Sequence, residues 1–368
     1  MLTPWLSYRM DLQRAPQRFW TDLGRIEAYA ETLCGFALGP GTLDRLTLDI
    51  RANAARAAAA AEFGPEIMAA PGGDDLAEAV GALFDVIDRR PDAPITAQTL
   101  SHDNEAAGDI AQAVALTQLA TVADGTGPAG PAAVAAASLA DQFATPRSWG
   151  KLTQFCDWLN GHEFLPAKDE TFQTAALRAI AAHQFLLILR PFNHGAEITA
   201  RLAAYRVLRA AGLPPLAAHL PAIHFGATAD QYLELATEAV EGGGATIAFA
   251  TYAADGMATG LRGLIRALHD AQTKSAWRDV VLQAFEGRER AGDRRRRVLL
   301  EDLGRQDAPV RIGALRGLSP RLADAYAGKS EKTLSRDVKW LETQGLIERT
   351  LKGVQPRRDA VYALAHAA

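Results

Sequence analysis

The chain has 368 residues, of which 48% are apolar, so it is long enough to bury the cores of two or three domains. Alanine-rich stretches dominate and alternating β-branched runs are scarce, which favours a mostly α fold. The two cysteines, Cys34 and Cys156, form no C-x-x-C pair and no disulfide framework, which is typical of a reducing cytoplasm.

The charge of the chain is uneven. Residues 288–368 contain 18 Lys and Arg against 11 Asp and Glu, a net charge of +7, whereas residues 1–287 carry −11. A basic C-terminal region predicts an anionic partner, although the run Arg294–Arg297 could instead form a solvated helix face. We expect neither a signal peptide, because charge interrupts the N-terminus early, nor a membrane span, because Gly and Pro break the apolar stretch 110–140.

Helical periodicity extends through most of residues 1–287. The expected helices span residues 1–34, 42–62, 74–90, 95–120, 132–143, 146–159, 171–189, 198–211, 230–241 and 245–270. Asp74 is expected to cap the third of them. We expect three segments: an N-terminal helical segment (1–45), a helical domain (46–287) and a C-terminal domain (288–368).

Residues 318–362 show two short helices followed by a β-hairpin. The elements expected are helices at 321–327 and 331–344, a strand from Leu346-Ile347, a basic loop at 352–358 and a returning strand at Val361-Tyr362. Ser319 and Ser330 are expected to cap the two helices. This order resembles the winged helix-turn-helix family, whose members place the second helix in the major groove of DNA.

The resemblance implies double-stranded DNA as a partner. The residues it places near bases or phosphates are Lys332, Thr333, Arg336, Lys339, Arg357 and Arg358. Leu334, Val338 and Leu341 recur at helical spacing, so their face of the second helix should pack inward, opposite the polar residues. Two alternatives stay open: a winged helix that contacts protein, and an ion pair between Arg336 and Asp337 or Glu342.

The stretch 180–212 is typical of a helix, a short loop and a second helix. The segment AAHQFLLILRPFNHGAEITARLAAYRVL resembles the core of the Fic fold, whose loop motif is His-Pro-Phe-x-(Asp/Glu)-Gly-Asn-Gly-Arg-x-x-Arg. The resemblance is strong over residues 175–212 and extends over about 45–270. It implies a helical domain of the kind that transfers AMP from ATP to a protein hydroxyl, and a winged helix is a common companion of such a domain.

The loop departs from the Fic motif at the residues that carry its chemistry. Arg190 replaces the general-base histidine, and a guanidinium cannot act as a base. His194 replaces the acid that holds Mg²⁺, and Ala196-Glu197 replaces part of the phosphate cradle. The matching residues are Pro191, Phe192, Gly195 and Arg201. On the helix at 42–62, Arg51 occupies the position of the glutamate that restrains active members of the family.

We therefore expect no catalytic residues, no metal site and no bound cofactor. ATP is the one cofactor that the resemblance would suggest. Three interpretations of the loop stay open. They are a turn held by an Arg–Glu ion pair with His194 exposed, catalysis by His194 and Glu197, and an anion or nucleotide pocket formed by Arg190, Asn193, His194, Gly195 and Arg201. His183, on the preceding helix, is expected to be a core residue.

These features together predict a cytoplasmic, bacterial, DNA-binding transcriptional regulator. Its degenerate Fic-like domain would serve for dimerisation or for sensing a small-molecule or nucleotide effector. A homodimer is expected because one module makes few base contacts. The alternative is a protein nucleotidyltransferase with a divergent active-site loop.

Overall fold

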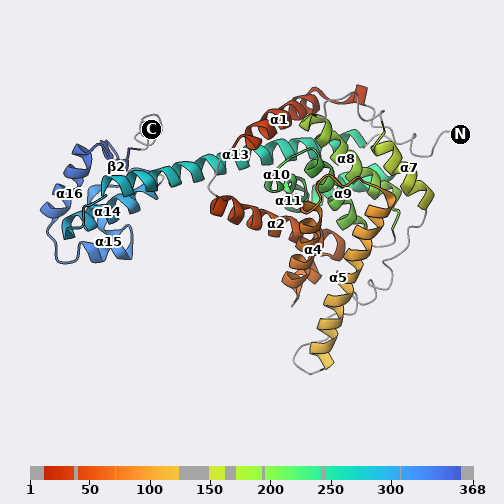
Figure 1. The fold of residues 1–368 in the computed structure, drawn as a ribbon, viewed down its shortest axis with the longest axis horizontal. Helices are drawn as coiled ribbons and strands as arrows, with labels where there is room; N and C mark the ends of the chain where they lie inside the picture. Colours follow the sequence, from red (N-terminus) through yellow and green to blue (C-terminus); the bar gives the residue numbers. More distant parts are fainter. Residues whose placement is uncertain are drawn as a thin grey trace. The chain divides into compact units, whose positions relative to one another are not determined.

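The computed structural model describes residues 12–36, 40–70, 72–123, 149–161, 171–192, 195–241, 246–306 and 308–357. The chain is mostly helical, as predicted, and the described residues also form one small antiparallel sheet (Figure 1). It divides into two compact units, Met1–Ile265 and Arg266–Ala368. Helix α13 (Thr246–Ala284) runs through the division.

Helices make up the described part of the first unit. They are η2 (Leu12–Arg14), α1 (Gln17–Cys34), α2 (Pro40–Phe63), α3 (Pro65–Ala69), α4 (Gly73–Asp88), α5 (Ala97–Ala123), α7 (Trp149–Leu159), α8 (Phe172–Leu189), α9 (Ala196–Ala210), α10 (Pro215–Ala218), α11 (Leu220–Ala227), α12 (Ala229–Glu241) and the first part of α13. The helix expected at 132–143 lies outside the described residues. Asp74 does not cap α4, because Gly72 takes that position and Asp74 pairs with Arg56 instead.

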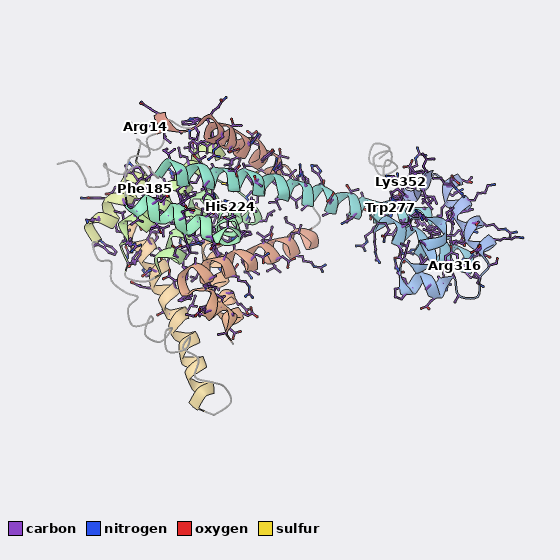
Figure 2. The ribbon with its side chains drawn as sticks, turned by 180° about the vertical axis from the view of Figure 1, so that it is seen from behind. Arg14, Phe185, His224, Trp277, Arg316 and Lys352 are labelled. Carbon is purple, nitrogen blue, oxygen red and sulfur yellow. The ribbon has the colours of Figure 1, made fainter. Side chains whose placement is uncertain are left out.

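The central element of the first unit is α8, which contacts α1, α7, α9 and α12. Nearly every side chain from Ala175 to Leu187 is buried, and Phe185 lies inside the unit (Figure 2). By length and composition α8 could cross a membrane, but 67% of it is buried within the unit. A helix that is apolar on all sides is typical of such a core position. The hydroxyl of Thr171 caps it by accepting from the Thr174 N–H.

Alanine lets the neighbouring helices approach closely. Helix α2 packs against α4 and α11, and its side chains Ala54, Ala55, Ala58 and Ala59 are buried. In α11, a Cβ at Gly226 would lie 2.5 Å from the Cβ of Ala57, so only glycine allows this approach. The packing brings the C-terminal end of α2 to the loop between α8 and α9.

The second unit combines short helices with the sheet. After the end of α13 come α14 (Ala291–Gly304), η3 (Ile312–Gly317), α15 (Pro320–Ala325), α16 (Glu331–Thr343), β1 (Ile347–Thr350) and β2 (Gly353–Pro356). The strands pair antiparallel, with Ile347 opposite Pro356. Val310 and Val354 exchange two backbone hydrogen bonds of 2.8 Å, which adds a short extended segment beside β2.

The structure corrects the predicted hairpin. The strand that pairs with β1 is Gly353–Pro356, which lies inside the expected basic loop 352–358. Val354 is buried in the core of the unit, and burial of this side chain explains why the second strand begins at Gly353. Leu351 and Lys352 therefore form the turn. The expected strand at Val361-Tyr362 lies outside the described residues.

The last turns of α13 belong to the core of the second unit. Trp277, Val280, Val281 and Phe285 pack in one cluster with buried residues of α14, α15 and α16. The compact division lies at Ile265–Arg266, whereas the boundary expected from the sequence lies near 287. Helix α1 packs on α8, so most of the expected segment 1–45 that is described belongs with the first unit.

Candidate functional site

The loop between α8 and α9 has two left-handed residues. Arg190 ends α8 with φ of 41°, and Gly195 precedes α9 with φ of 74°. The Arg190 side chain is exposed, whereas Pro191 and Phe192 are buried and anchor the loop. Two of the residues expected in an anion pocket, Asn193 and His194, lie outside the described residues.

A carboxylate of the chain itself occupies the N-terminus of α9. Glu62, at the end of α2, accepts hydrogen bonds from the Gly195 N–H and, at 2.9 Å, from the Glu197 N–H. Burial raises the pKa of Glu62, and these backbone hydrogen bonds oppose the shift. The N–H groups of a helix N-terminus are a natural anion site, so here Glu62 takes the place of a bound anion.

Arg51, which the resemblance aligns with the restraining glutamate of the family, has a different partner on α4. Arg51 pairs with Asp85 of α4, whereas Glu62 reaches the loop from the end of the helix. Glu62 is the lone charged residue after a run of five alanines, 57–61, and it precedes Phe63-Gly64. A single charged residue at the end of such an apolar run was the available signal.

Behind the loop lies a buried polar network. Arg201 has a side chain only 1% exposed and pairs with Glu197. Its guanidinium lies 4.9 Å from the centre of the Tyr232 ring, and the Tyr232 hydroxyl donates to Glu197. The same hydroxyl lies 3.0 Å from Nε2 of His183. Burial, reinforced by nearby Arg201, holds the pKa of His183 well below its ordinary value, and burial raises the pKa of Tyr232.

The residues expected to form one anion pocket therefore do not line the same cavity. A cavity of about 280 Å³ is bordered by Arg190 and by two carboxylates, Glu62 and Glu197, and Arg201 is not among its lining residues. Two carboxylates against one guanidinium make a poor phosphate cradle. The expected Arg–Glu ion pair is formed by Arg201 and Glu197, and His183 is a core residue. Among the described residues, no group of three His, Cys, Asp or Glu is arranged to hold a metal ion.

Helix α16 has one apolar and one basic face. Leu334, Val338 and Leu341 are buried in the core of the second unit. Lys332, Arg336 and Lys339 recur at i, i+4 and i+7 and are exposed, and Thr333 beside them is half-buried. None of the three cations forms an ion pair with a described residue.

The ion pair suggested for Arg336 is not present. Asp337 points inward to Arg295 and Arg296, and Glu342 pairs with Arg349 of β1 at 3.0 Å. The Arg336 guanidinium is therefore left at the surface with the two lysines. We call Lys332, Arg336 and Lys339 the basic stripe of α16.

Asp337 fixes this helix to α14. Its carboxylate is buried and accepts from Nε of Arg295 at 2.7 Å, Nε of Arg296 at 2.8 Å and the Tyr326 hydroxyl at 3.0 Å. The Arg296 guanidinium also lies 4.8 Å from the centre of the Trp340 ring. We call these contacts of Asp337 the Asp337 clamp; they orient the basic stripe, and sequence reasoning missed them.

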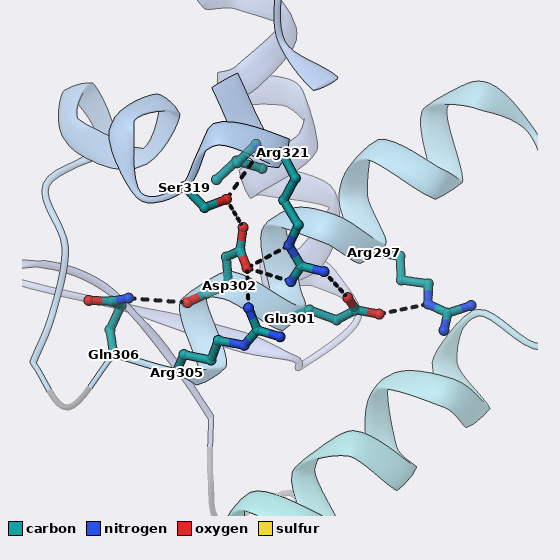
Figure 3. Close-up of polar contacts among 8 residues, drawn as sticks. Arg297, Glu301, Asp302, Arg305, Gln306, Ser319 and Arg321 are labelled. Atoms are coloured by element: carbon teal, nitrogen blue, oxygen red, sulfur yellow. Dashed lines mark hydrogen bonds and ion pairs between the residues drawn. The ribbon is translucent and has the colours of Figure 1, made fainter. Parts of the chain in front are cut away.

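A second carboxylate, Asp302, organises the start of α15 (Figure 3). It accepts from the Ser319 hydroxyl, from Nε of Arg321 at 2.9 Å and from Arg305 at 3.3 Å. Ser319 in turn caps α15 by accepting from the Leu322 N–H, as predicted. Although burial opposes ionisation, the hydrogen bonds from Arg321 and Ser319 hold the pKa of Asp302 below its ordinary value.

The run Arg294–Arg297 is only partly a solvated helix face, because Arg294 and Arg297 are exposed whereas Arg295 and Arg296 are half-buried. Arg294 donates to the Glu289 carbonyl, and Arg297 pairs with Glu301, which also accepts from Arg321 (Figure 3). Arg295 and Arg296 are held in the Asp337 clamp. Much of the basic excess of the C-terminal region thus holds its helices together.

The remaining predicted DNA contacts lie at the hairpin. Arg357 is exposed directly after β2, and Arg358 lies outside the described residues. Lys352, in the turn, and Lys329, two residues before α16, are further exposed cations of this unit. The expected cap at Ser330 is not formed, since its hydroxyl lies 3.3 Å from that of Thr333 and bonds no backbone N–H.

No family model matches the chain, and no curated protein is similar to it.

Proposed function

We propose that the protein is a DNA-binding transcriptional regulator and that its second unit is a winged helix with α16 as the recognition helix. The observation that carries the proposal is the basic stripe of α16. Its three cations are exposed and unpaired with described residues, whereas most arginines of α14 are held in ion pairs. Unpaired cations on one helix face favour a polyanionic partner.

The order of elements supports the proposal. A helix (α14), a short extended segment at Val310, two helices (α15 and α16) and a hairpin (β1 and β2) follow one another as in a winged helix-turn-helix. In that arrangement the second helix of the pair enters the major groove. The hairpin turn with Lys352 serves as the wing and contacts phosphates.

Each polar residue of α16 has a chemistry suited to this role. Arg336 at the centre of the stripe can donate two parallel hydrogen bonds to a guanine edge. Lys332 and Lys339 act as point charges toward phosphates, and Thr333 can donate or accept a single hydrogen bond. The Asp337 clamp holds the helix in a single orientation, which sequence-specific recognition requires.

The first unit is proposed to be a Fic-like platform for dimerisation or effector binding, without catalytic activity. Three observations support this: Glu62 occupies the N–H groups of α9, Arg201 is buried in an ion pair, and Arg190 offers no general base. The alternative of AMP transfer gains no support from this geometry.

Fluorescence anisotropy with labelled duplexes tests the proposal. The double variant Arg336→Ala/Lys339→Ala should bind about 30-fold more weakly at physiological salt, because a base contact contributes about 1–3 kcal/mol and about 2 kcal/mol corresponds to 30-fold. The salt dependence of binding should also become shallower by about one unit of slope for each lost phosphate contact. The matched control is Arg262→Ala/Arg266→Ala, which removes two exposed cations of α13 and should leave the affinity unchanged. Equal affinity of both variants and the wild type would refute the role of α16.

A further inference from the structure

A cavity of about 570 Å³ lies in the second unit between the last turns of α13 and α14. Its lining residues are Lys274, Trp277, Arg278, Val281, Leu282, Arg297, Glu301, Gly304 and Arg305. Figure 2 labels Trp277 on this part of α13. The volume is within the range of about 300–1,000 Å³ that is usual for small-molecule sites. Neither the basic stripe nor the Asp337 clamp contributes to the cavity.

One wall of the cavity is apolar. Trp277 and Val281 are buried, and Leu282 beside them is 50% exposed although it is a large hydrophobic residue. Gly304 makes room for the indole, since a Cβ there would lie 2.0 Å from Nε1 of Trp277. The indole N–H is buried without a hydrogen-bond partner in the described part of the chain. A buried indole N–H normally has a partner, so among the described residues the Trp277 N–H is an unsatisfied donor packed beside Gly304.

The charged residues around the cavity are mostly cations. Lys274 and Arg278 are exposed on α13 and form no ion pair with a described residue. Glu301 is the single carboxylate among the lining residues, and it already accepts from Arg297 at 2.8 Å and from Arg321 at 3.0 Å. The unpaired charge that faces an incoming molecule is therefore positive.

We propose that this cavity binds a small organic anion with a flat apolar body, such as an aromatic carboxylate or sulfonate. The apolar body packs on Trp277, Val281 and Leu282, and the anionic group pairs with Lys274 and Arg278 at the rim. An inorganic anion would leave the apolar wall uncovered, and a cation would face the two unpaired cations. Guanidinium groups bind planar carboxylates in bidentate geometry, which suits Arg278. The proposal does not depend on DNA binding.

Residues that line the cavity are also linked by ion pairs to α15, one of the two helices proposed to bind DNA. Arg297 and Glu301 belong both to the cavity and to the chain of ion pairs that reaches Arg321 of α15. An anion that also reached Arg297 would compete with Glu301, which holds Arg321 of α15 as well. Such coupling is an added consequence of binding, and binding itself can be measured without DNA.

Titration of the full chain with 8-anilinonaphthalene-1-sulfonate tests the site, because this probe joins a sulfonate to an aromatic body and brightens in apolar surroundings. The expected result is saturable binding of about one probe per chain. Lys274→Glu/Arg278→Glu should weaken it at least about tenfold, because two attractive contacts become repulsive. Arg262→Glu/Arg266→Glu changes the net charge equally outside the cavity and should bind like the wild type.

A second probe and a second variant separate charge from nonspecific adsorption. The uncharged N-phenyl-1-naphthylamine should show less than a twofold change between the two charge-reversal variants. Leu282→Glu alters one exposed residue of the apolar wall and should weaken both probes, even if Lys274→Glu/Arg278→Glu fails to fold by circular dichroism. No saturable sulfonate binding by the wild type, or equal binding by all variants, would overturn the proposal.

Discussion

Replacement of Asp337 by asparagine tests how the basic stripe of α16 is held in place. The wild-type carboxylate accepts three hydrogen bonds, two of them from the charged groups of Arg295 and Arg296. Asparagine has the same size, but its amide NH₂ would face a guanidinium donor, so at least one charge-assisted hydrogen bond is lost. Such a bond contributes about 1.5–3 kcal/mol.

The two arginines are not fully enclosed, which limits the loss. Their side chains are 15% and 24% exposed, so part of each guanidinium can regain water. We therefore expect Asp337→Asn to lower the free energy of opening of α16 by about 2 kcal/mol, below the 3–5 kcal/mol typical when a fully buried pair is broken. Since 1.4 kcal/mol is a factor of ten, amide exchange in α16 should become about 30-fold faster.

Hydrogen–deuterium exchange of the full chain, read from peptides that cover α16, measures this change. The control is Glu342→Gln, which removes the exposed pair with Arg349 and should change the opening free energy by less than about 0.5 kcal/mol. Exchange in Asp337→Asn within twofold of the wild type would refute the idea that this carboxylate fixes the helix.

Three further changes test other parts of the fold. Burial lowers the pKa of His219 from 6.5 to about 3, so the folded chain binds fewer protons than the unfolded chain. The free energy of unfolding, measured in urea, should therefore fall by about 1.4 kcal/mol per pH unit as the pH drops below 6.5, and a flat profile to pH 4.5 would contradict this. Glu62→Ala leaves the N–H groups of Gly195 and Glu197 without their acceptor and should cost about 2 kcal/mol in urea unfolding, whereas Glu62→Gln keeps an acceptor oxygen and should cost less. In Gly353→Ala the new Cβ would lie 2.3 Å from the Val310 carbonyl oxygen at a φ of 146°, so thermal unfolding should show a loss of about 3 kcal/mol; an unchanged melting temperature would show that the bridge can shift.

Local patterns in the sequence predicted the parts of the fold that depend on neighbouring residues. The helical spacing of Leu334, Val338 and Leu341 identified the buried face of α16, and Ser319 before a proline identified the cap of α15. The same periodicity located most helices of the first unit. These signals span one or two turns, so no knowledge of distant contacts was needed.

Contacts between distant residues escaped this reasoning. Asp337 looks like one more polar residue on α16, and its partners Arg295 and Arg296 lie more than forty residues earlier. Glu62 and Gly195 are separated by 133 residues, and nothing local marks the glutamate as the acceptor for α9. The hairpin was misplaced for a related reason, because the pairing of Val354 with Val310 decides where the chain returns.

The continuity of α13 affects how the chain can be cut. Proteases cleave exposed irregular backbone, and the division at Ile265–Arg266 offers only helix, so limited proteolysis should not reveal it. A truncated chain that starts near residue 288 would lose Trp277, Val280, Val281 and Phe285 and leave the apolar side of α14 open to water. A fragment intended to fold alone should therefore begin at about Arg266, in the middle of a helix.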